Sequence, residues 1–176
     1  MIRINNEKRK RNIINLLAAS FFFFLVIGVY KTISAQKDYF PSDYRKWHHA
    51  KTMILEEGHP LFEAFGGIHH VYVNDKAYKS IKRGEGRKFE DGSVIVFDLL
   101  EVKKSQGAVE EGNRKVLAYM RKDSKNKELE KTGGWEYKAF AGGDPKNQIV
   151  NDPVGQCHNC HTQMKDKDFV FSEWRN

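Results

Sequence analysis

The sequence predicts an α+β domain in which an antiparallel, β-rich sheet carries flanking helices. Short apolar and β-branched runs recur between glycine-rich turns, a pattern typical of strands joined by hairpins. An apolar segment near the N-terminus stands apart, and the roughly 140 residues after it suffice for one hydrophobic core but not for two. We therefore expect one folded domain over residues 36–176, preceded by a separate segment over residues 1–35.

The expected elements follow in order along the chain. A helix should begin with Ser42 or Asp43 as its N-cap and continue through Trp47 to about Leu55, because Gly58-His59-Pro60 stops it. The pattern then becomes strand-like. Strands are expected over residues 68–73, 93–100, 116–120 and 135–140, and residues 74–76 should form the turn that ends the first strand. Such runs joined by turns predict the antiparallel sheet.

The N-terminal segment predicts attachment to a membrane. A basic cluster that includes Arg3 and Arg11 precedes an uncharged run over residues 13–30, and Lys31 closes the run. As a transmembrane helix this run would extend about 27 Å, close to the roughly 30 Å hydrocarbon core of a bilayer. We expect an uncleaved inner-membrane anchor, or alternatively a signal peptide cleaved after Ala35. Because basic flanks stay in the cytoplasm, the domain should be periplasmic or otherwise extracytoplasmic.

The formal net charge of +7 is concentrated in this N-terminal segment. Six of the 30 basic residues and one of the 23 acidic residues lie before residue 36, so the domain that follows is nearly neutral. A nucleic-acid partner would require a basic face on the folded domain. The composition therefore argues against nucleic-acid binding.

The pentapeptide Cys157-His158-Asn159-Cys160-His161 spells C-x-x-C-H, the attachment motif of a c-type haem. Its two thiols are the only cysteines of the chain. In this chemistry the thiols form thioethers with the haem vinyl groups, and the adjacent imidazole is carried to the iron as the proximal ligand. The motif therefore predicts one covalent haem c bound through Cys157 and Cys160, with His161 on the iron.

Two other kinds of site use similar residues. A structural zinc site needs four protein ligands, yet no second C-x-x-C or H-x3–5-H pair accompanies this motif. A thioredoxin-like dithiol would follow a strand within a βαβ pattern, which is absent before the motif. Haem is attached outside the cytoplasm, so the expected export of the domain favours the haem interpretation. Four-helix-bundle cytochromes also place this motif near the C-terminus, but their long amphipathic helices are missing from this sequence.

An ordered series of motifs over roughly residues 41–172 resembles the cytochrome P-460 and cytochrome c′-β family. The matching stretches are residues 44–47, 68–73, 89–96, 133–135, 140, 157–161 and 167–172. The resemblance implies a β-sheet-rich, usually homodimeric protein with one haem c. It also implies that the motif histidine is the proximal ligand and that strand side chains build the distal face.

One position departs from the family members that oxidise hydroxylamine. Those members carry a lysine, cross-linked to the porphyrin rim, where this chain has Phe97. A phenyl ring has no amine to form that bond, so the chain is more similar to the cytochrome c′-β branch, whose distal pockets are capped by phenylalanine. Strand alternation places Ile95 and Leu99 on the same face as Phe97, which predicts an apolar distal wall.

Three polar residues are further candidates for the distal pocket or the haem edge. His69 stands where hydroxylamine-oxidising members carry a distal arginine, and it alternates with His70, so only one of the two points inward from a regular strand. Either could be a hydrogen-bond donor, a sixth iron ligand or an exposed imidazole. Asp152, just before Pro153, could approach the haem edge.

An apolar distal wall predicts a particular class of ligand. It offers water no hydrogen-bond partner, whereas nitric oxide and carbon monoxide bind ferrous haem with little need for one. We expect binding or scavenging of nitric oxide and similar gases. One alternative is an electron-transfer cytochrome, in which a protein side chain is the sixth iron ligand and another cytochrome is the redox partner. The other alternative is residual oxidation of hydroxylamine.

Overall fold

The computed structural model describes residues 39–84 and 86–175. The expected N-terminal anchor over residues 13–30, and the segment 1–35 as a whole, lie outside these residues. Within the described part of the chain, no helix is long and apolar enough to cross a membrane.

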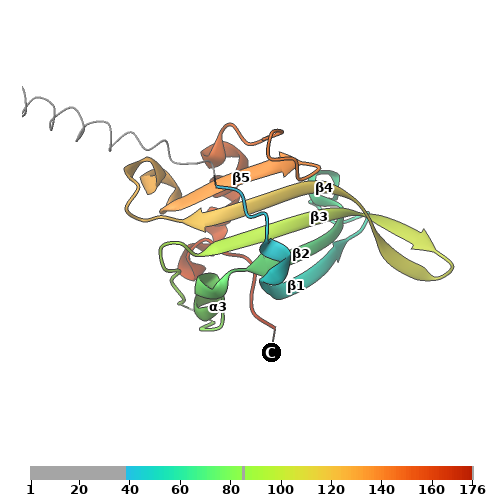
Figure 1. The fold of residues 1–176 in the computed structure, drawn as a ribbon, viewed down its shortest axis with the longest axis horizontal. Helices are drawn as coiled ribbons and strands as arrows, with labels where there is room; N and C mark the ends of the chain where they lie inside the picture. Colours follow the sequence, from blue (N-terminus) through green and yellow to red (C-terminus); the bar gives the residue numbers. More distant parts are fainter. Residues whose placement is uncertain (1–38, 85, 176) are drawn as a thin grey trace, which may run out of the picture. The chain divides into compact units, whose positions relative to one another are not determined.

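A single five-stranded sheet forms the centre of the described domain (Figure 1). Its strands are β1 (His48–Leu55), β2 (Gly67–Val73), β3 (Val94–Ser105), β4 (Ala108–Lys122) and β5 (Trp135–Ala141). They lie in sequence order, and every neighbouring pair is antiparallel. The α+β prediction and the four strands expected after residue 67 are confirmed, although β3 and β4 are longer than expected.

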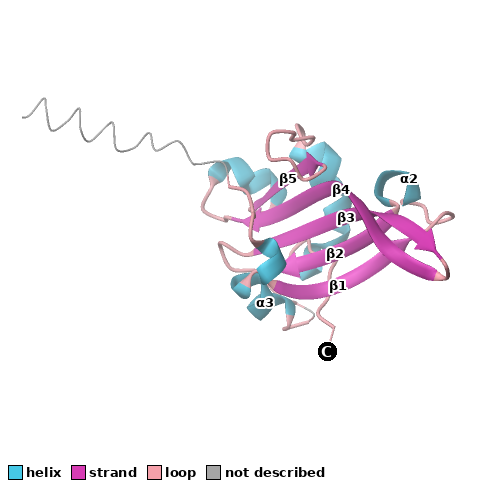
Figure 2. Cartoon of the chain, turned by 45° about the vertical axis from the view of Figure 1, so that its right-hand side comes forward, coloured by secondary structure: helices cyan, strands magenta, loops and turns pink. Residues whose placement is uncertain are grey.

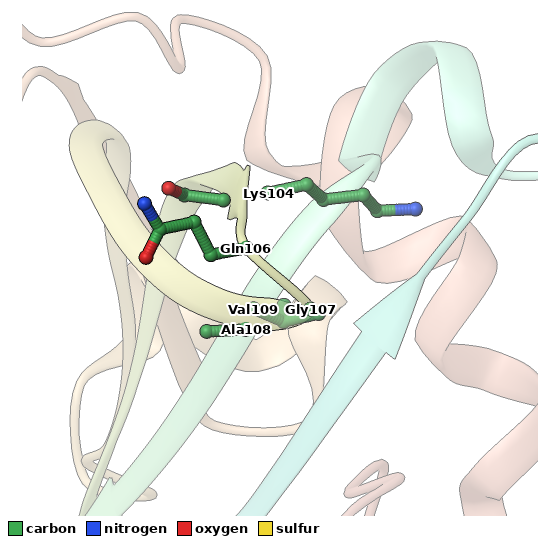
Figure 3. Close-up of a pocket in the computed structure, with 6 residues that line it drawn as sticks. Lys104, Gln106, Gly107, Ala108 and Val109 are labelled. Carbon is green, nitrogen blue, oxygen red and sulfur yellow. The ribbon is translucent and has the colours of Figure 1, made fainter.

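The extra length of β3 and β4 forms a hairpin arm that extends beyond the other strands (Figure 2). The pairing of the two strands is irregular near Leu100, where the arm leaves the sheet. At its tip, a shallow hollow lies among residues 104–109 (Figure 3). This hollow offers one lysine but no histidine, cysteine or carboxylate, so its lining lacks the side chains that commonly hold a metal ion.

Short helices flank the sheet and account for the rest of the regular structure in residues 39–84 and 86–175. They are η1 (Tyr44–Lys46), α2 (Phe62–Phe65), α3 (Asp75–Ile81), η2 (Lys127–Thr132) and a C-terminal series made of η3 (Val154–His158), α4 (Asn159–His161) and η4 (Thr162–Lys167). The C-terminal series contains the complete C-x-x-C-H motif.

The helix expected from residue 42 or 43 to Leu55 is wrong. Only one turn of helix forms, at η1, and Asp43 makes no side-chain capping bond there. Residues 48–55 instead form β1, which pairs with β2 and bonds to it through the side chains of Thr52 and His70. A short helix here would gain only local contacts, whereas the strand completes the backbone hydrogen bonds of the sheet, so tertiary pairing overrides the helical pattern.

The turn expected at residues 74–76 is instead the start of α3. The side-chain oxygen of Asn74 accepts hydrogen bonds from Ala77 N at 3.0 Å and from Val94 N at 3.1 Å. The first bond caps the helix, and the second ties it to the start of β3. Asn74 is a strong turn former and an equally strong N-cap, which is why the pattern alone pointed to the turn.

The two faces of the sheet are covered by different segments. In Figure 1 the residues just after position 39 cross the front of the sheet, and the C-terminal segment lies behind it. On the front face, Asp98 is fully buried and accepts hydrogen bonds from the Tyr44 hydroxyl and from Arg114 Nε at 2.6 Å. On the back face, Val71, Ile95 and other apolar side chains form the main core against the C-terminal segment.

Candidate functional site

The motif segment begins at a tightly capped turn. Asp152 Oδ1 accepts a hydrogen bond from Gly155 N at 3.1 Å, and the Gln156 side chain accepts one in return from Asp152 N at 2.8 Å. Pro153 follows the cap directly, where a residue without an N–H costs nothing. A Cβ at Gly155 would lie 2.3 Å from Asp152 Oδ2, so a larger residue at position 155 would push this carboxylate out of place. The observed role of Asp152 is to start this helix, and its approach to a haem edge stays a prediction.

His161 has a defined tautomer because of one backbone contact. Its Nδ1 atom lies 2.7 Å from the backbone oxygen of Phe169. A carbonyl oxygen can only accept, so Nδ1 carries the hydrogen and Nε2 keeps its lone pair. Metal-binding histidines commonly use this arrangement, which fixes the ring and leaves the other nitrogen available as a ligand.

Burial also keeps His161 in the form that a metal requires. Desolvation lowers the pKa of this imidazole below its ordinary value, which favours the neutral ring. Tyr137 and Phe171 border the ring with centroid distances of 5.1 Å and 5.0 Å, both in edge-on geometry. The imidazole is therefore neutral and sterically confined.

A strained turn presents the Phe169 carbonyl to His161. Asp168 and Phe169 have φ values of 53° and 65°, in the left-handed region that side chains rarely adopt. The Asp168 carboxylate holds the turn, because it accepts from Lys122 Nζ at 2.7 Å and from Phe89 N at 2.8 Å. Two consecutive residues in this region persist only when surrounding contacts enforce them.

Arg87 fixes the chain just after this turn. Its guanidinium is almost fully buried and donates to the backbone oxygens of Val170 at 2.9 Å and Ser172 at 2.7 Å. The carbonyl that His161 uses and the ring of Phe171 are thereby held in one rigid tail. Sequence reasoning missed Arg87, because a lone arginine carries no motif; the 167–172 stretch was marked only by the family resemblance.

His158, the inner residue of the motif, faces the core. It is buried, and its Nδ1 lies 3.3 Å from the Tyr137 hydroxyl. Burial lowers the pKa of His158 and raises the pKa of Tyr137, so both side chains are neutral. The pair connects β5 to the motif helix, a role that the C-x-x-C-H pattern alone does not assign.

Phe97 and the motif segment both pack on the back face of the sheet. Phe97 and Cys157 both contact the core cluster that contains Ile95. In register, Phe97 lies beside Ala118, and Ala118 lies beside Ala139 of β5. The face therefore carries two small side chains beside the half-buried Phe97 ring. Ile95, Phe97 and Leu99 lie on one face, and Leu99 is buried next to Gly67. That they form a distal wall stays a prediction.

Two phenyl rings at this face are exposed. Phe65 is 43% exposed and meets Phe97 edge-on at 6.1 Å, and Phe171 is 42% exposed beside His161. One ring therefore lies on the Phe97 side of the face and the other on the His161 side.

His69 and His70 point to opposite faces, as strand alternation requires. His69 is buried at 3% exposure, and its ring meets Phe97 edge-on at 4.7 Å. His70 lies on the other face, where it bonds Thr52 at 2.9 Å and Glu111 at 2.7 Å. Of the two histidines, His69 is thus the one beside Phe97.

The thiols do not resemble those of a redox dithiol or a zinc site. Burial, and to a smaller extent the nearby Asp152, raises the pKa of the Cys157 thiol, whereas reactive dithiols have a lowered pKa. The sheet before the motif is antiparallel, without a βαβ unit. Within residues 39–84 and 86–175, no three histidine, cysteine or acidic side chains gather to hold a metal ion.

The donor set fits haem c. Two thiols and a neutral imidazole with a free Nε2 lie on one short helical segment, next to an apolar sheet face with exposed aromatic rings. A family model described as cytochrome P460 matches residues 41–172, which is more than half of the chain. A search of curated proteins returned no match.

Proposed function

We propose that this chain, which belongs to the cytochrome P460 family, is an exported c-type cytochrome that binds or scavenges nitric oxide and similar small gases. Membership of the family implies a cytochrome that binds haem. The finer proposal is that Cys157 and Cys160 hold one haem covalently and that His161 is its proximal ligand. The haem, when bound, supplies an iron that binds diatomic gases.

The observation that carries this proposal is the contact between His161 and Phe169. The Phe169 carbonyl accepts the hydrogen of His161 Nδ1, so the ring can ligate only through Nε2. Tyr137 and Phe171 border this ring and limit its rotation. The chain thus prepares a neutral, oriented imidazole one residue after the second thiol.

The side chains of the sheet face decide which ligands are favoured. Phe97, Ile95 and Val71 exclude water because they offer it no hydrogen-bond partner. Neutral diatomic molecules pay no such penalty on entering an apolar site. This difference supports gas binding over coordination of water in the ferrous protein.

An electron-transfer cytochrome is the second candidate, and one observation favours it. His69 is buried beside Phe97, and its Nδ1 has no hydrogen-bond partner. An imidazole in that state has a lone pair that could ligate iron from the distal side. Oxidation of hydroxylamine is less favoured, because Phe97 cannot supply the cross-linking amine.

The ferrous spectrum separates these candidates. The full chain, produced in a host that attaches haem c, is reduced and its optical and resonance Raman spectra are recorded. We expect a five-coordinate, high-spin ferrous haem that binds nitric oxide at once on mixing. A low-spin ferrous spectrum that becomes five-coordinate in the His69→Ala variant would instead support electron transfer.

The remaining parts of the proposal concern assembly and location. The N-terminal run over residues 13–30 supports an anchored, extracytoplasmic domain, and the family resemblance supports a homodimer. Fractionation of cells and light scattering of the detergent-solubilised full chain test these two points. Recovery of the protein in the cytosol, or as a monomer at micromolar concentration, would contradict them.

A further inference from the structure

His69 is a buried imidazole whose hydrogen can be placed from its contacts. Its Nε2 is in short contact with the backbone oxygen of Phe65. Because a carbonyl only accepts, Nε2 must carry the hydrogen. The Nδ1 atom of a neutral ring then has a lone pair and no hydrogen.

This lone pair lacks any partner among the described residues. His69 Nδ1 is inaccessible to solvent and accepts no hydrogen bond. A buried acceptor without a partner costs about 1–3 kcal/mol, so native proteins rarely retain one without a use. The His69 ring meets the Phe97 ring edge-on, with 4.7 Å between the ring centroids. Both rings lie on the back face of the sheet.

The surroundings oppose the other protonation states. Burial lowers the pKa of His69, and the nearby positive charge of Lys115 acts in the same direction. Lys115 Nζ itself donates to Gly66 O at 2.7 Å. If Nδ1 carried the hydrogen instead, the Nε2 lone pair would face the Phe65 oxygen, and the two would repel. The neutral ring with hydrogen on Nε2 is therefore the favoured state.

We propose that His69 is the specificity-determining residue of the distal side, and that it offers a bound ligand an acceptor and no donor. The inference rests on the proposed function, because it takes the back face of the sheet as the distal side. It names a ligand class: small molecules with an N–H hydrogen on the coordinating atom, such as a primary amine. Nitric oxide and carbon monoxide gain nothing from His69, and dioxygen, which needs a donor, is disfavoured.

The first test determines the tautomer directly. Long-range proton–nitrogen NMR is recorded on the diamagnetic, carbon monoxide-bound ferrous protein at pH 7.5, with the His69→Gln variant used to assign the ring. We expect a protonated Nε2 and an unprotonated Nδ1. A hydrogen on Nδ1, or a doubly protonated ring, would overturn the proposal. This readout requires neither turnover nor any destabilising substitution.

The second test measures ligand preference in the ferric protein. Methylamine, counted as its free base, is the N–H donor, and nitric oxide is the ligand without a hydrogen. His69→Phe should weaken methylamine binding about tenfold, the size expected for removal of a buried acceptor, and leave nitric oxide affinity within about twofold. His69→Gln can still donate to the Phe65 oxygen and accept from the ligand, so it should lose less.

The matched control is His70→Phe, which makes the same change one residue away on the opposite face. It should leave both affinities unchanged. Equal loss of both ligands in His69→Phe, or no loss of either, would overturn the inference. If the ratio of dioxygen affinity to carbon monoxide affinity falls in His69→Phe, the inference is also overturned. Such a fall would identify His69 as a hydrogen-bond donor to bound dioxygen.

Failure of the inference can be told apart from failure of the proposed function. A protein without covalent haem contradicts the proposed function. If the protein carries haem and binds nitric oxide, but its methylamine affinity is the same in the unmodified protein and in His69→Phe, only the inference is contradicted. A low-spin iron in the unliganded protein that becomes high-spin in His69→Phe would show that Nδ1 is an iron ligand, which overturns the acceptor role.

Discussion

The Nδ1 atom of His161 and the backbone oxygen of Phe169 lie 2.7 Å apart, and this one contact leaves Nε2 as the only ligating atom of the ring. The contact joins the C-x-x-C-H motif to a turn eight residues later. That turn is held by Asp168, whose carboxylate bonds Lys122 and Phe89 N. Orientation of the proposed iron ligand thus depends on residues outside the motif.

Removal of both thiols should abolish covalent haem attachment. The Cys157→Ala, Cys160→Ala double variant and the unmodified protein are denatured, separated on a gel and stained for haem peroxidase activity. The stain should remain with the unmodified protein and disappear from the variant, because no other cysteine exists to form a thioether. Stain that persists in the variant would refute this attachment.

The haem should carry no bond to lysine. Peptide mapping by mass spectrometry should find haem only on the peptide that contains Cys157 and Cys160, because Phe97 has no amine. Lys115 is the lysine whose charge acts on His69, so its peptide is the one to inspect. Haem attached to that peptide would show that a cross-link forms from a different strand. Hydroxylamine oxidation should be slow or absent.

Replacement of Phe97 by alanine should open the site. Loss of the ring removes an apolar cap and creates a cavity, so carbon monoxide should bind the ferrous protein about tenfold faster, and water should reach the ferric iron. Stopped-flow mixing and ferric resonance Raman spectra measure these effects. Phe140→Ala is the control, because Phe140 is buried on the opposite face. Equal acceleration in both variants would assign the effect to general loosening.

Replacement of Asp168 by asparagine should loosen the proximal ligand. The change leaves Lys122 without its carboxylate partner at a largely buried site, which should lower the free energy of unfolding by about 2–3 kcal/mol. The iron–histidine stretching band should also broaden or shift, because the turn that carries the Phe169 carbonyl loses its anchor. Urea unfolding and resonance Raman spectra measure these changes. The exposed Asp166→Asn variant should change neither, and a matching response there would contradict the assignment.

Stability should fall on mild acidification partly because of His69. Burial lowers its pKa below the ordinary value of 6.5, so the unfolded chain takes up a proton before the folded protein does. Its contribution is present above about pH 6.5 and is lost as the pH falls below that value. Lys115, His59 and His70 act on the ring in the same direction.

This pH effect can be isolated by comparison with a variant. Urea unfolding of the unmodified holoprotein and of His69→Phe at pH 7.5 and pH 5.5 gives two differences in unfolding free energy. The unmodified protein should lose up to about 1.4 kcal/mol more over this range. Identical losses would show that the folded protein protonates His69 as readily as the unfolded chain does.

The sequence by itself determined the strands after residue 67 and the α+β class. Runs such as residues 68–73 and 135–140 combine β-branched or aromatic residues with glycine-rich borders, and these local preferences agree with the pairing that the sheet imposes. It also predicts covalent haem attachment, because C-x-x-C-H joins two thiols to an adjacent imidazole. The split of His69 and His70 between two faces followed from strand alternation alone.

Only the tertiary structure decided the secondary structure of residues 48–55. Their pattern permits a helix, and the open edge of β2 provides backbone partners that a helix could not use, so they become β1. The tertiary structure alone also brought the Phe169 carbonyl into contact with His161 Nδ1 and buried Arg87 against the backbone of Val170. It left His69 Nδ1 without a hydrogen-bond partner among the described residues. These are contacts between a backbone atom or buried side chain and a residue distant in space or sequence. Local sequence patterns encode propensity and periodicity, and such contacts depend on neither.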